Sequence, residues 1–437
     1  MFETLRNAFK IRELRLRILF TFAMLVVVRA GSQLPVPGVN PDVFKNLFAN
    51  AGDSMNFFDA ITGGSFEQMS VFALNITPYI TSSIIMQLLT IAFPKLEEIQ
   101  RDGEQGRKKI TQITRYLTIG LSILESGAMA YGFGRGGYLT AFNALTVLEV
   151  MATLTAGSAI LMWIGERITE RGIGNGISIV LIINIISRIP GDLAALYEQF
   201  IAGRSAARGV LAAVIIAAII IGVIVLVVIL QCAERRIPVQ YSRKIAGRRM
   251  VGGTSTYIPM KVNTGGVIPV IFAQSLLQTP VIIMSLLGKS GGTGFWSNVL
   301  RGMSQSNWFN PNNWIFTIGA VVYIALIIAF AYFYTSITFN PLEIADNMKK
   351  QGGFIPGIRP GKPTSEYLAN VLSKIVLIGA IGLCIVAILP IMFNGLFGAS
   401  VSFGGTSLII IVGVVIETLK QVESQMMVRN YRGFLSE

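Results

Sequence analysis

The stretch Val210–Leu230 reads VLAAVIIAAIIIGVIVLVVIL, without a single charged or strongly polar side chain. At 1.5 Å per residue, a helix of this length spans the roughly 30 Å hydrocarbon core of a bilayer. The stretch Ile375–Met392 is uncharged in the same way. In the whole chain 52% of residues are apolar and 14% are charged, whereas a soluble domain carries about 25% charged residues. These features predict a protein that crosses a membrane several times.

Ten apolar segments of suitable length occur along the chain, and we expect each to form a transmembrane helix. An even number of spans places both chain ends on one side of the membrane. The predicted fold is therefore an all-α integral membrane protein with ten transmembrane helices. The segments lie at about 18–36, 71–93, 116–134, 144–165, 173–190, 210–232, 263–288, 313–339, 367–393 and 401–422.

Lysine and arginine alternate between the segments that connect these spans. Most of the 36 basic residues, which give the chain a net charge of +13, lie at the two ends and in every second connection. Because positively charged connections stay on the cytoplasmic side, both termini are predicted to be cytoplasmic. This topology accounts for the positive charge, so a nucleic-acid partner is not required. The basic residues in or near the opposite side are Arg29, Lys45, Arg135, Arg188, Arg204, Arg208, Lys289 and Arg301.

A predicted external segment at about 191–209 divides the chain into two halves, residues 1–190 and 210–437, with five spans each. Two halves with an odd number of spans insert in opposite orientations, as in inverted-repeat transporters and channels. The second half also contains two large predicted cytoplasmic loops, at about 231–264 and 340–366.

The short segment Met55–Met69 does not fit a plain bundle of spans, because it is too short and too rich in glycine and acidic residues. Its first part, Met55–Ile61, is compatible with a partly apolar helix, and Gly63-Gly64 separates that part from the second span. Non-helical backbone at membrane depth is tolerated only inside protein or beside a water-filled cavity. The pattern fits both such a half-helix and an amphipathic helix on the membrane surface.

The chain offers few groups for chemistry within the membrane. It has no histidine, and Cys232 and Cys384 lack the spacing of a zinc or redox motif. A coupled transporter needs several charged groups at depth, and an intramembrane protease needs paired aspartates or a Ser–His arrangement. Glu125 is the only carboxylate at a central depth, and amides such as Asn75 and Asn184 are expected to hydrogen-bond between helices. We therefore expect neither an enzyme nor a cofactor.

The second cytoplasmic loop contains GFIPGIRPGK at 353–362. Proline and glycine at these positions predict an ordered turn rather than a continuing helix. An arginine on such a rigid tip, here Arg359, is suited to docking an acidic partner. A second basic cluster in the first loop contains Arg248 and Arg249. Ordinary topological charge is the alternative interpretation for any one of these residues.

Six motifs, in order along the chain, resemble the SecY family of protein-conducting channels. The resemblance extends over essentially the whole chain. The motifs are RAGSQLPVPG at 29–38, FALNITPYI at 72–80, ERGIGNGIS at 170–178, KVNTGGVIP at 261–269, PGIRPG at 356–361 and GGTS at 404–407. The resemblance implies an hourglass-shaped pore between two inverted five-helix halves, and a short plug half-helix that closes it.

The resemblance also assigns residues to this pore. A ring of apolar side chains would form its waist: Ile76, Ile80, Ile177, Leu181, Ile271 and Ile410. The i, i+4 spacing places Ile76 with Ile80, and Ile177 with Leu181, on common helix faces. Leucine at 181, where isoleucine is more usual in the family, should preserve the seal. The plug at about 55–69 would include Met55, Phe57, Phe58, Ile61, Gly63 and Gly64, and the lateral gate would include Gln87, Glu125, Gln274 and Gln278.

Partners and location follow from the same resemblance. The family implies a small SecE subunit, commonly a SecG subunit, and either the motor ATPase SecA or a ribosome docked at Arg248, Arg249 and Arg359. Signal sequences and nascent chains would be the substrates, and transmembrane segments would leave sideways into lipid. The implied location is the bacterial cytoplasmic membrane. The alternative function is an inverted-repeat secondary transporter.

Overall fold

The computed structural model of this chain describes residues 9–40, 62–202, 206–241, 244–246, 249–251, 255–286, 295–309, 314–397 and 405–433. Each of the predicted spans overlaps one of its long helices. These are α2 (Arg12–Gly31), α5 (Thr77–Ala92), α7 (Gly103–Gly136), α8 (Ala144–Arg171), α9 (Gly176–Phe200), α10 (Ala206–Cys232), α11 (Ile268–Leu286), α13 (Ile318–Thr338), α15 (Lys362–Phe397) and α16 (Gly405–Gly433). The shorter helices are α6 (Pro94–Arg101), α12 (Phe295–Met303) and α14 (Pro341–Lys350), with 3-10 turns η1 (Gln305–Asn307) and η2 (Trp314–Thr317).

Within the described residues, five helical stretches are long and apolar enough by themselves to cross a membrane. They are Ala144–Arg171, Gly176–Phe200, Gly209–Cys232, Trp314–Lys350 and Lys362–Phe393. A sixth is added if α5 and α6 count as one span, although the chain bends by 108° between them. Helices α2, α7 and α16 are also long, but the charged residues within them reduce their apolar content.

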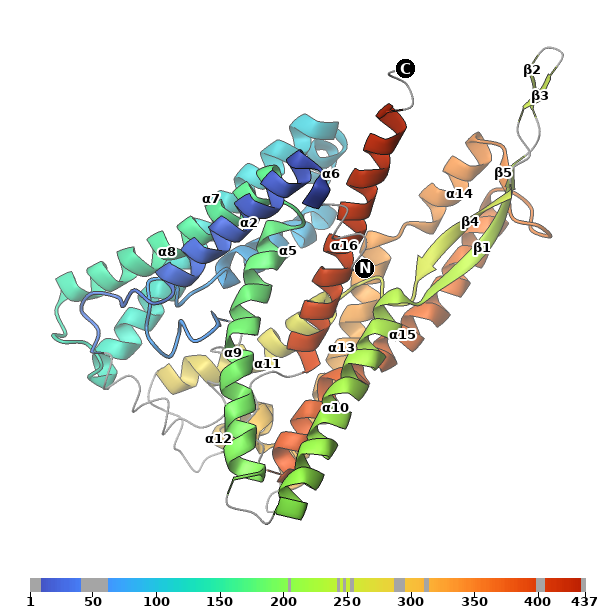
Figure 1. Cartoon of the computed structure of the whole chain (residues 1–437). Coiled ribbons are helices and arrows are strands. Elements are labelled where there is room, and N and C mark those ends of the chain that lie inside the picture. The colour runs from blue at the N-terminus through green and yellow to red at the C-terminus, as the bar shows by residue number, and fades with distance from the viewer. Residues whose placement is uncertain are drawn as a thin grey trace.

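The elements separate toward two ends of the molecule as the charge pattern predicts. In Figure 1 the C-terminal end of α16, the short helices α6 and α14 and the β-strands lie toward one end, and α12 and the α9–α10 connection lie toward the other. The first group carries the basic connections that the sequence assigns to the cytoplasm. The fold therefore has a strongly basic end. The positive-inside rule predicts that this end faces the cytoplasm.

A small β-sheet at the basic end departs from the predicted all-α fold. Strands β4 (Ser255–Lys261), β1 (Glu234–Tyr241) and β5 (Gly353–Phe354) form one antiparallel sheet, in which Ile237 pairs with Ile258 and Gln240 with Phe354. A separate pair, β2 (Lys244–Ala246) and β3 (Arg249–Val251), extends beyond it. Ile237 and Val239 alternate inward along β1 and pack with Leu368 of α15. Alternating burial is typical of a strand with one face on the core. Because β1 pairs with β5, the two loops that were predicted to be cytoplasmic share one sheet.

Several helix boundaries differ from the predicted spans, among them the start of the second span and the end of the fifth. The second span was expected from residue 71, but residues 71–76 form turns, and α5 begins only at Thr77. The reason is local: Asn75 has a left-handed φ of 52°, and Pro78 suits the first turn of a helix. The fifth span was expected to end near 190, but α9 continues through Pro190 to Phe200. Much of the predicted external segment 191–209 is therefore helical.

The apolar core is divided between the two halves of the chain. In the first half, α8 packs against α7, whose buried face has a small or hydroxyl side chain at every fourth residue from Thr114 to Gly134. Hydroxyl contacts join the two helices, with Ser122 Oγ 3.3 Å from Ser158 Oγ and Ser126 Oγ 3.0 Å from Thr155 Oγ1. Small residues let helix backbones approach closely, and hydroxyl groups bond across the contact. This close pair forms one wall of the site described next.

Candidate functional site

The loop before α9 fixes the position of Ile177. Gly174 has a left-handed φ of 79°, and the side chain of Asn175 then caps the helix, its Oδ1 accepting from the Ile177 N–H at 3.2 Å. A Cβ on Gly176 would lie only 1.9 Å from the carbonyl oxygen of Gly165 on α8. In the pattern GNG, Gly174 therefore provides the turn, Asn175 caps the helix and Gly176 allows the close contact with α8. Together they fix the first turn of α9 against α8.

The start of α5 is fixed by a buried pair of amides. Asn184 Nδ2 on α9 donates to Asn75 Oδ1 at 3.1 Å, and both side chains are buried. This contact confirms the prediction that these amides hydrogen-bond between segments. It holds the left-handed turn directly before Ile76, whose side chain is fully buried. The turn thus determines where Ile76 and Ile80 point.

The predicted ring residues fall into two adjoining apolar clusters. Ile76 packs with Leu161, Ile164 and Ile168 of α8, and Ile80 and Ile177 pack against the same cluster. A second cluster brings Ile410 of α16 and Ile271 of α11 together with Ile185 of α9. The first cluster belongs to the first half of the chain, whereas the second joins the two halves.

Leu181 connects the two clusters along one helix. Ile177, Leu181 and Ile185 are spaced four residues apart on α9, so they share a helix face. Ile177 packs in the first cluster and Ile185 in the second, and Leu181 lies between them, 8% exposed. Helix α9 therefore links the contributions of α5, α11 and α16 into one apolar zone.

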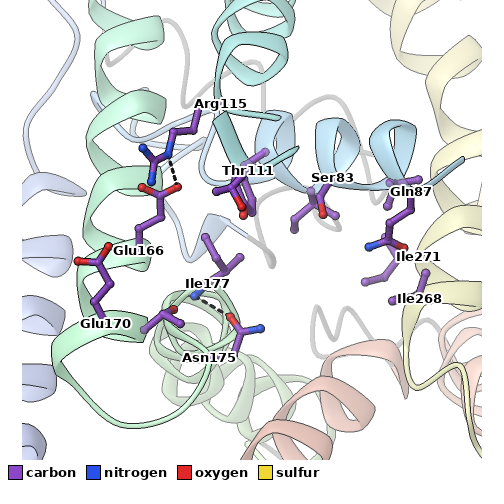
Figure 2. A pocket seen from close by; sticks show the side chains of 14 residues that line it. Ser83, Gln87, Thr111, Arg115, Glu166, Glu170, Asn175, Ile177, Ile268 and Ile271 are labelled. Carbon is purple, nitrogen blue, oxygen red and sulfur yellow. Dashed lines mark hydrogen bonds and ion pairs between the residues drawn. The ribbon is translucent and has the colours of Figure 1, made fainter. Parts of the chain in front are cut away.

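A cavity of about 410 Å³ lies against this apolar zone. Ile80, Ile177 and Ile271 line it from three helices, α5, α9 and α11. Most of the other residues that line it are of polar type, and Figure 2 shows Arg115, Glu166 and Glu170 on one side and Gln87 with Ile271 on the other. Because these charged groups lie at the basic ends of α7 and α8, the cavity is on the side that the positive-inside rule assigns to the cytoplasm.

The charges in the cavity wall are paired. Arg115 Nε lies 2.7 Å from Glu166 Oε1, and Arg167 Nη1 lies 2.7 Å from Glu170 Oε2. The guanidinium of Arg167 also sits over the ring of Trp163, 5.6 Å from its centroid. Because each positive side chain here is paired with a negative one, this part of the wall is hydrophilic but has no strong electrostatic potential of one sign. Among the described residues, no group of three or more Cys, Asp or Glu is placed to hold a metal ion.

A different set of polar contacts lies beyond the apolar zone, at the start of the turn segment 62–76. Arg29 Nη1 donates to the carbonyl oxygen of Gly63 at 3.2 Å, and Ser187 Oγ, which donates to the Asn184 carbonyl at 2.6 Å, lies 3.4 Å from the same Gly63 oxygen. Arg188 Nη1 on α9 forms an ion pair with Glu67 Oε2 at 2.9 Å. The apolar zone thus has a polar layer on each side. In the sequence, the only sign of this second polar layer is that Arg29 and Arg188 lie in or near connections on the side where basic residues are few.

The four predicted gate residues occupy different places. Gln87 lines the cavity, and Glu125 is half-buried on α7. Gln274 on α11 points elsewhere: it is buried, and its Nε2 donates to Gln305 Oε1 of η1 at 3.3 Å. In this structure Gln274 therefore joins α11 to the segment after α12. The side chain of Gln278 lies outside the described residues.

The remaining predicted residues are only partly described. Met55, Phe57, Phe58 and Ile61 of the predicted plug lie outside the described residues, as do Arg248 and the side chain of Arg249. Gly63 and Gly64 are described, with φ of 69° and 84°. Arg359 is exposed on an ordered turn, as predicted, between Gly357 and Gly361 with φ of 83° and 106°. Its carbonyl accepts from Thr364 Oγ1 at 2.8 Å.

Comparison with known proteins gives consistent matches. The sequence profile of the SecY family matches residues 70–419. A relative from Streptomyces galbus, named protein translocase subunit SecY, is 45% identical over 451 residues that cover 100% of both chains. A solved structure described as a protein conducting channel aligns with a TM-score of 0.66 at 20% identity, covering 94% of this chain and 92% of that one. Sec61 in a canine ribosome-channel complex aligns with a TM-score of 0.64, also at 20% identity and with the same coverage.

Proposed function

This chain belongs to the SecY family, and from that premise we propose that it is the channel through which unfolded polypeptides cross the membrane. The observation that carries the proposal is the cavity on the basic side, which meets an apolar zone made by Ile80, Ile177 and Ile271 from three different helices. A vestibule lined in part by charged and polar side chains, next to an apolar zone that would form a constriction, is the arrangement of a gated passage.

The ring of apolar side chains would block ions at rest and would widen around a passing polypeptide. Ile76, Ile80, Ile177, Leu181, Ile271 and Ile410 would form the waist of an hourglass between two inverted five-helix halves. An apolar constriction dewets and so blocks ions while the channel rests. Its contacts are dispersion and apolar burial rather than directional bonds, and such contacts can re-form around a passing chain of any sequence.

The plug and the gate complete the proposed cycle. The segment at about 55–69 would close the vestibule beyond the ring. Helix α11 contacts α7, and this seam, with α5 and α13 beside it, would be the lateral gate. An apolar signal sequence or nascent transmembrane helix would open the seam because lipid solvates that segment better than water does. The same opening would release transmembrane segments into the bilayer.

Partners would supply energy and stability. The paired cavity charges and the buried amides give no coupling site for an ion gradient, which favours a passive channel over the secondary transporter. SecE and SecG are the proposed companion subunits. The exposed turn at Arg359, with the basic cluster at Arg248 and Arg249, is the proposed dock for SecA or a ribosome, and the canine ribosome-bound relative supports the latter. The proposed location is the bacterial cytoplasmic membrane, with both termini cytoplasmic.

Crosslinking of an arrested secretory chain tests this function. Single cysteines at positions 76, 80, 177 and 271 should each capture a chain that is stalled halfway through the channel. Cysteine at Leu145, which is exposed on α8, provides a control outside the proposed path. Crosslinks at position 145 but not at the four ring positions would refute the pore.

A further inference from the structure

One buried hydrogen bond joins two segments that lie on different sides of the cavity. Figure 2 shows Ser83 and Gln87 of α5 on one side of the cavity and Asn175, at the start of α9, on another. Helix α5 packs chiefly against α7, whereas α9 packs chiefly against α8 and α16. The bond from Asn184 Nδ2 to Asn75 Oδ1, 3.1 Å long, connects the two sides directly.

The bond lies at the end of the apolar zone farther from the cavity. Ile177, Leu181 and Asn184 are spaced four and three residues apart on α9, so they share one helix face. At 1.5 Å per residue, Asn184 lies about 10 Å along the helix from Ile177, which lines the cavity. Across the bond, Asn75 directly precedes Ile76, which is fully buried in the first cluster. One polar pair therefore ends the row of apolar side chains.

The backbone at Asn75 adopts a conformation that suits asparagine. Its φ of 52° is left-handed, a region that asparagine tolerates better than most residues other than glycine. The turn before it packs on α8, since a Cβ on Gly157 would lie 2.0 Å from the carbonyl oxygen of Val71. The Asn75 side chain is wholly buried, and Asn184 is 3% exposed. Among the described residues, the Asn184 Oδ1 atom has no hydrogen-bond partner, so this side chain depends on its bond to Asn75.

This bond differs from the apolar contacts around it in its response to movement. An amide hydrogen bond is lost when its two atoms separate by about 1 Å, whereas apolar side chains can exchange one neighbour for another. Amides that part inside an apolar zone also lose their partner without gaining water, which makes the separation costly. The pair therefore favours one spacing of α5 and α9, which the apolar contacts alone would not define.

We propose that Asn75 and Asn184 are positioning residues for the apolar ring: their bond holds α5 and α9 at the closed spacing, and a passing polypeptide must break it. The inference rests on the channel of the proposed function. The pair would act only on the closed state, because in an occupied channel the two amides are already apart. It would thus set how often the empty ring opens without changing the width of the open passage.

Single-channel recording of the reconstituted chain with its partner subunits tests the inference. Asn75→Gly removes one amide and suits the left-handed φ, and Asn184→Leu replaces the other amide by an apolar side chain of similar size. Each variant should shorten the closed intervals between openings of the empty channel roughly fivefold, the effect of losing one buried hydrogen bond worth about 1 kcal/mol. The conductance of each opening should stay that of the wild type.

Two comparisons separate positioning from general damage. The double variant should open no more often than the more active single variant, because the same bond is lost in all three. Ser158→Ala is the matched control: it removes a buried hydroxyl contact between α7 and α8, 3.3 Å long, and Ser158 is not part of the cavity lining. Its closed intervals should match the wild type. Single variants no more active than Ser158→Ala, or effects that add in the double variant, would overturn the inference.

Channels that hold an arrested secretory chain provide a second test. Once the chain occupies the ring, the ion leak of Asn75→Gly, Asn184→Leu and wild type should be equal, since the bond is broken in all of them. A larger leak of the occupied variants would contradict the proposal, because the amides would then shape the open passage.

The same preparation distinguishes this inference from the proposed function. Wild-type channels supplied with a motor and a signal-bearing precursor should take the precursor up. If they do not, the proposed function fails. If they do, and the single variants keep the closed intervals of the wild type, only the role of the amide pair fails.

Discussion

Nε of Arg115 lies 2.7 Å from Oε1 of Glu166, and this ion pair joins α7 to α8 in the wall of the cavity. The side chains are 44% and 17% exposed, so solvent weakens the attraction. The glutamate is the more enclosed partner and depends more on its counter-ion.

The first prediction concerns this pair. Glu166→Gln should lower the stability of the purified complex by on the order of 1 kcal/mol, because it removes the counter-ion of Arg115 from a half-enclosed wall. Arg115→Glu combined with Glu166→Arg should recover most of the loss. Thermal unfolding in detergent measures both. Equal stability of Glu166→Gln and wild type would show that the pair contributes nothing to the α7–α8 wall.

The second prediction concerns the apolar ring. Ile80→Asp should produce an ion leak at rest, because a carboxylate in the constriction retains water where isoleucine excludes it. Leu181→Ile should leave the leak unchanged, since it exchanges one apolar side chain for another of the same size. Single-channel conductance of the reconstituted complex checks both variants. A tight Ile80→Asp channel would favour a transporter, which such a change would merely disable.

The third prediction concerns the glycine that seats α9. Gly176→Ala should destabilise the protein by about 1–3 kcal/mol and displace Ile177, because its Cβ would meet the Gly165 carbonyl at 1.9 Å. Gly191→Ala on the same helix is the control: an added Cβ there has nothing within 4 Å. That change should be neutral or slightly stabilising, since alanine is the better helix former. Thermal unfolding of the two variants provides the measurement, and equal stability of Gly176→Ala and Gly191→Ala would contradict the prediction.

The fourth prediction concerns the ordered turn. Arg359→Glu should weaken binding of SecA or of ribosomes at least tenfold, because a repulsive charge replaces an attractive one on a rigid tip. The resting ion leak should not change. Lys350→Glu, exposed on the neighbouring helix α14, is the matched control for general loss of positive charge. Binding titrations with vesicles at two salt concentrations provide the measurement, and equal effects of the two variants would remove the special role of the turn.

Several features of the fold and site could be predicted without coordinates. The long apolar stretches predict helices because burial in lipid and the need to pair every backbone group are local requirements. Amides such as Asn75 and Asn184 were expected to hydrogen-bond between helices. The structure has these two bonded to each other at 3.1 Å, although Asn75 lies in the turn before α5 and not in a helix. Proline and glycine predicted the ordered turn around Arg359 for the same local reason.

Other features depend on which segments meet in space. Arg188 and Glu67 are 121 residues apart, and Arg115 and Glu166 are 51 apart. The spacing of residues along the chain does not predict that either pair meets. Likewise, the bond from Gln274 to Gln305 follows from how α11 turns against the segment after α12, and the shared sheet of the two loops follows from a pairing between β1 and β5.

By itself, then, the sequence determined that the chain is a helical membrane protein whose basic residues gather in alternate connections, with a few arginines, among them Arg29 and Arg188, in the other connections. Only the tertiary structure decided that Ile80, Ile177 and Ile271 line one cavity and that Arg29 and Arg188 hold one turn. The physical reason is that burial and helix formation depend on neighbours in the chain, whereas the meeting of side chains from different helices depends on close packing between whole helices.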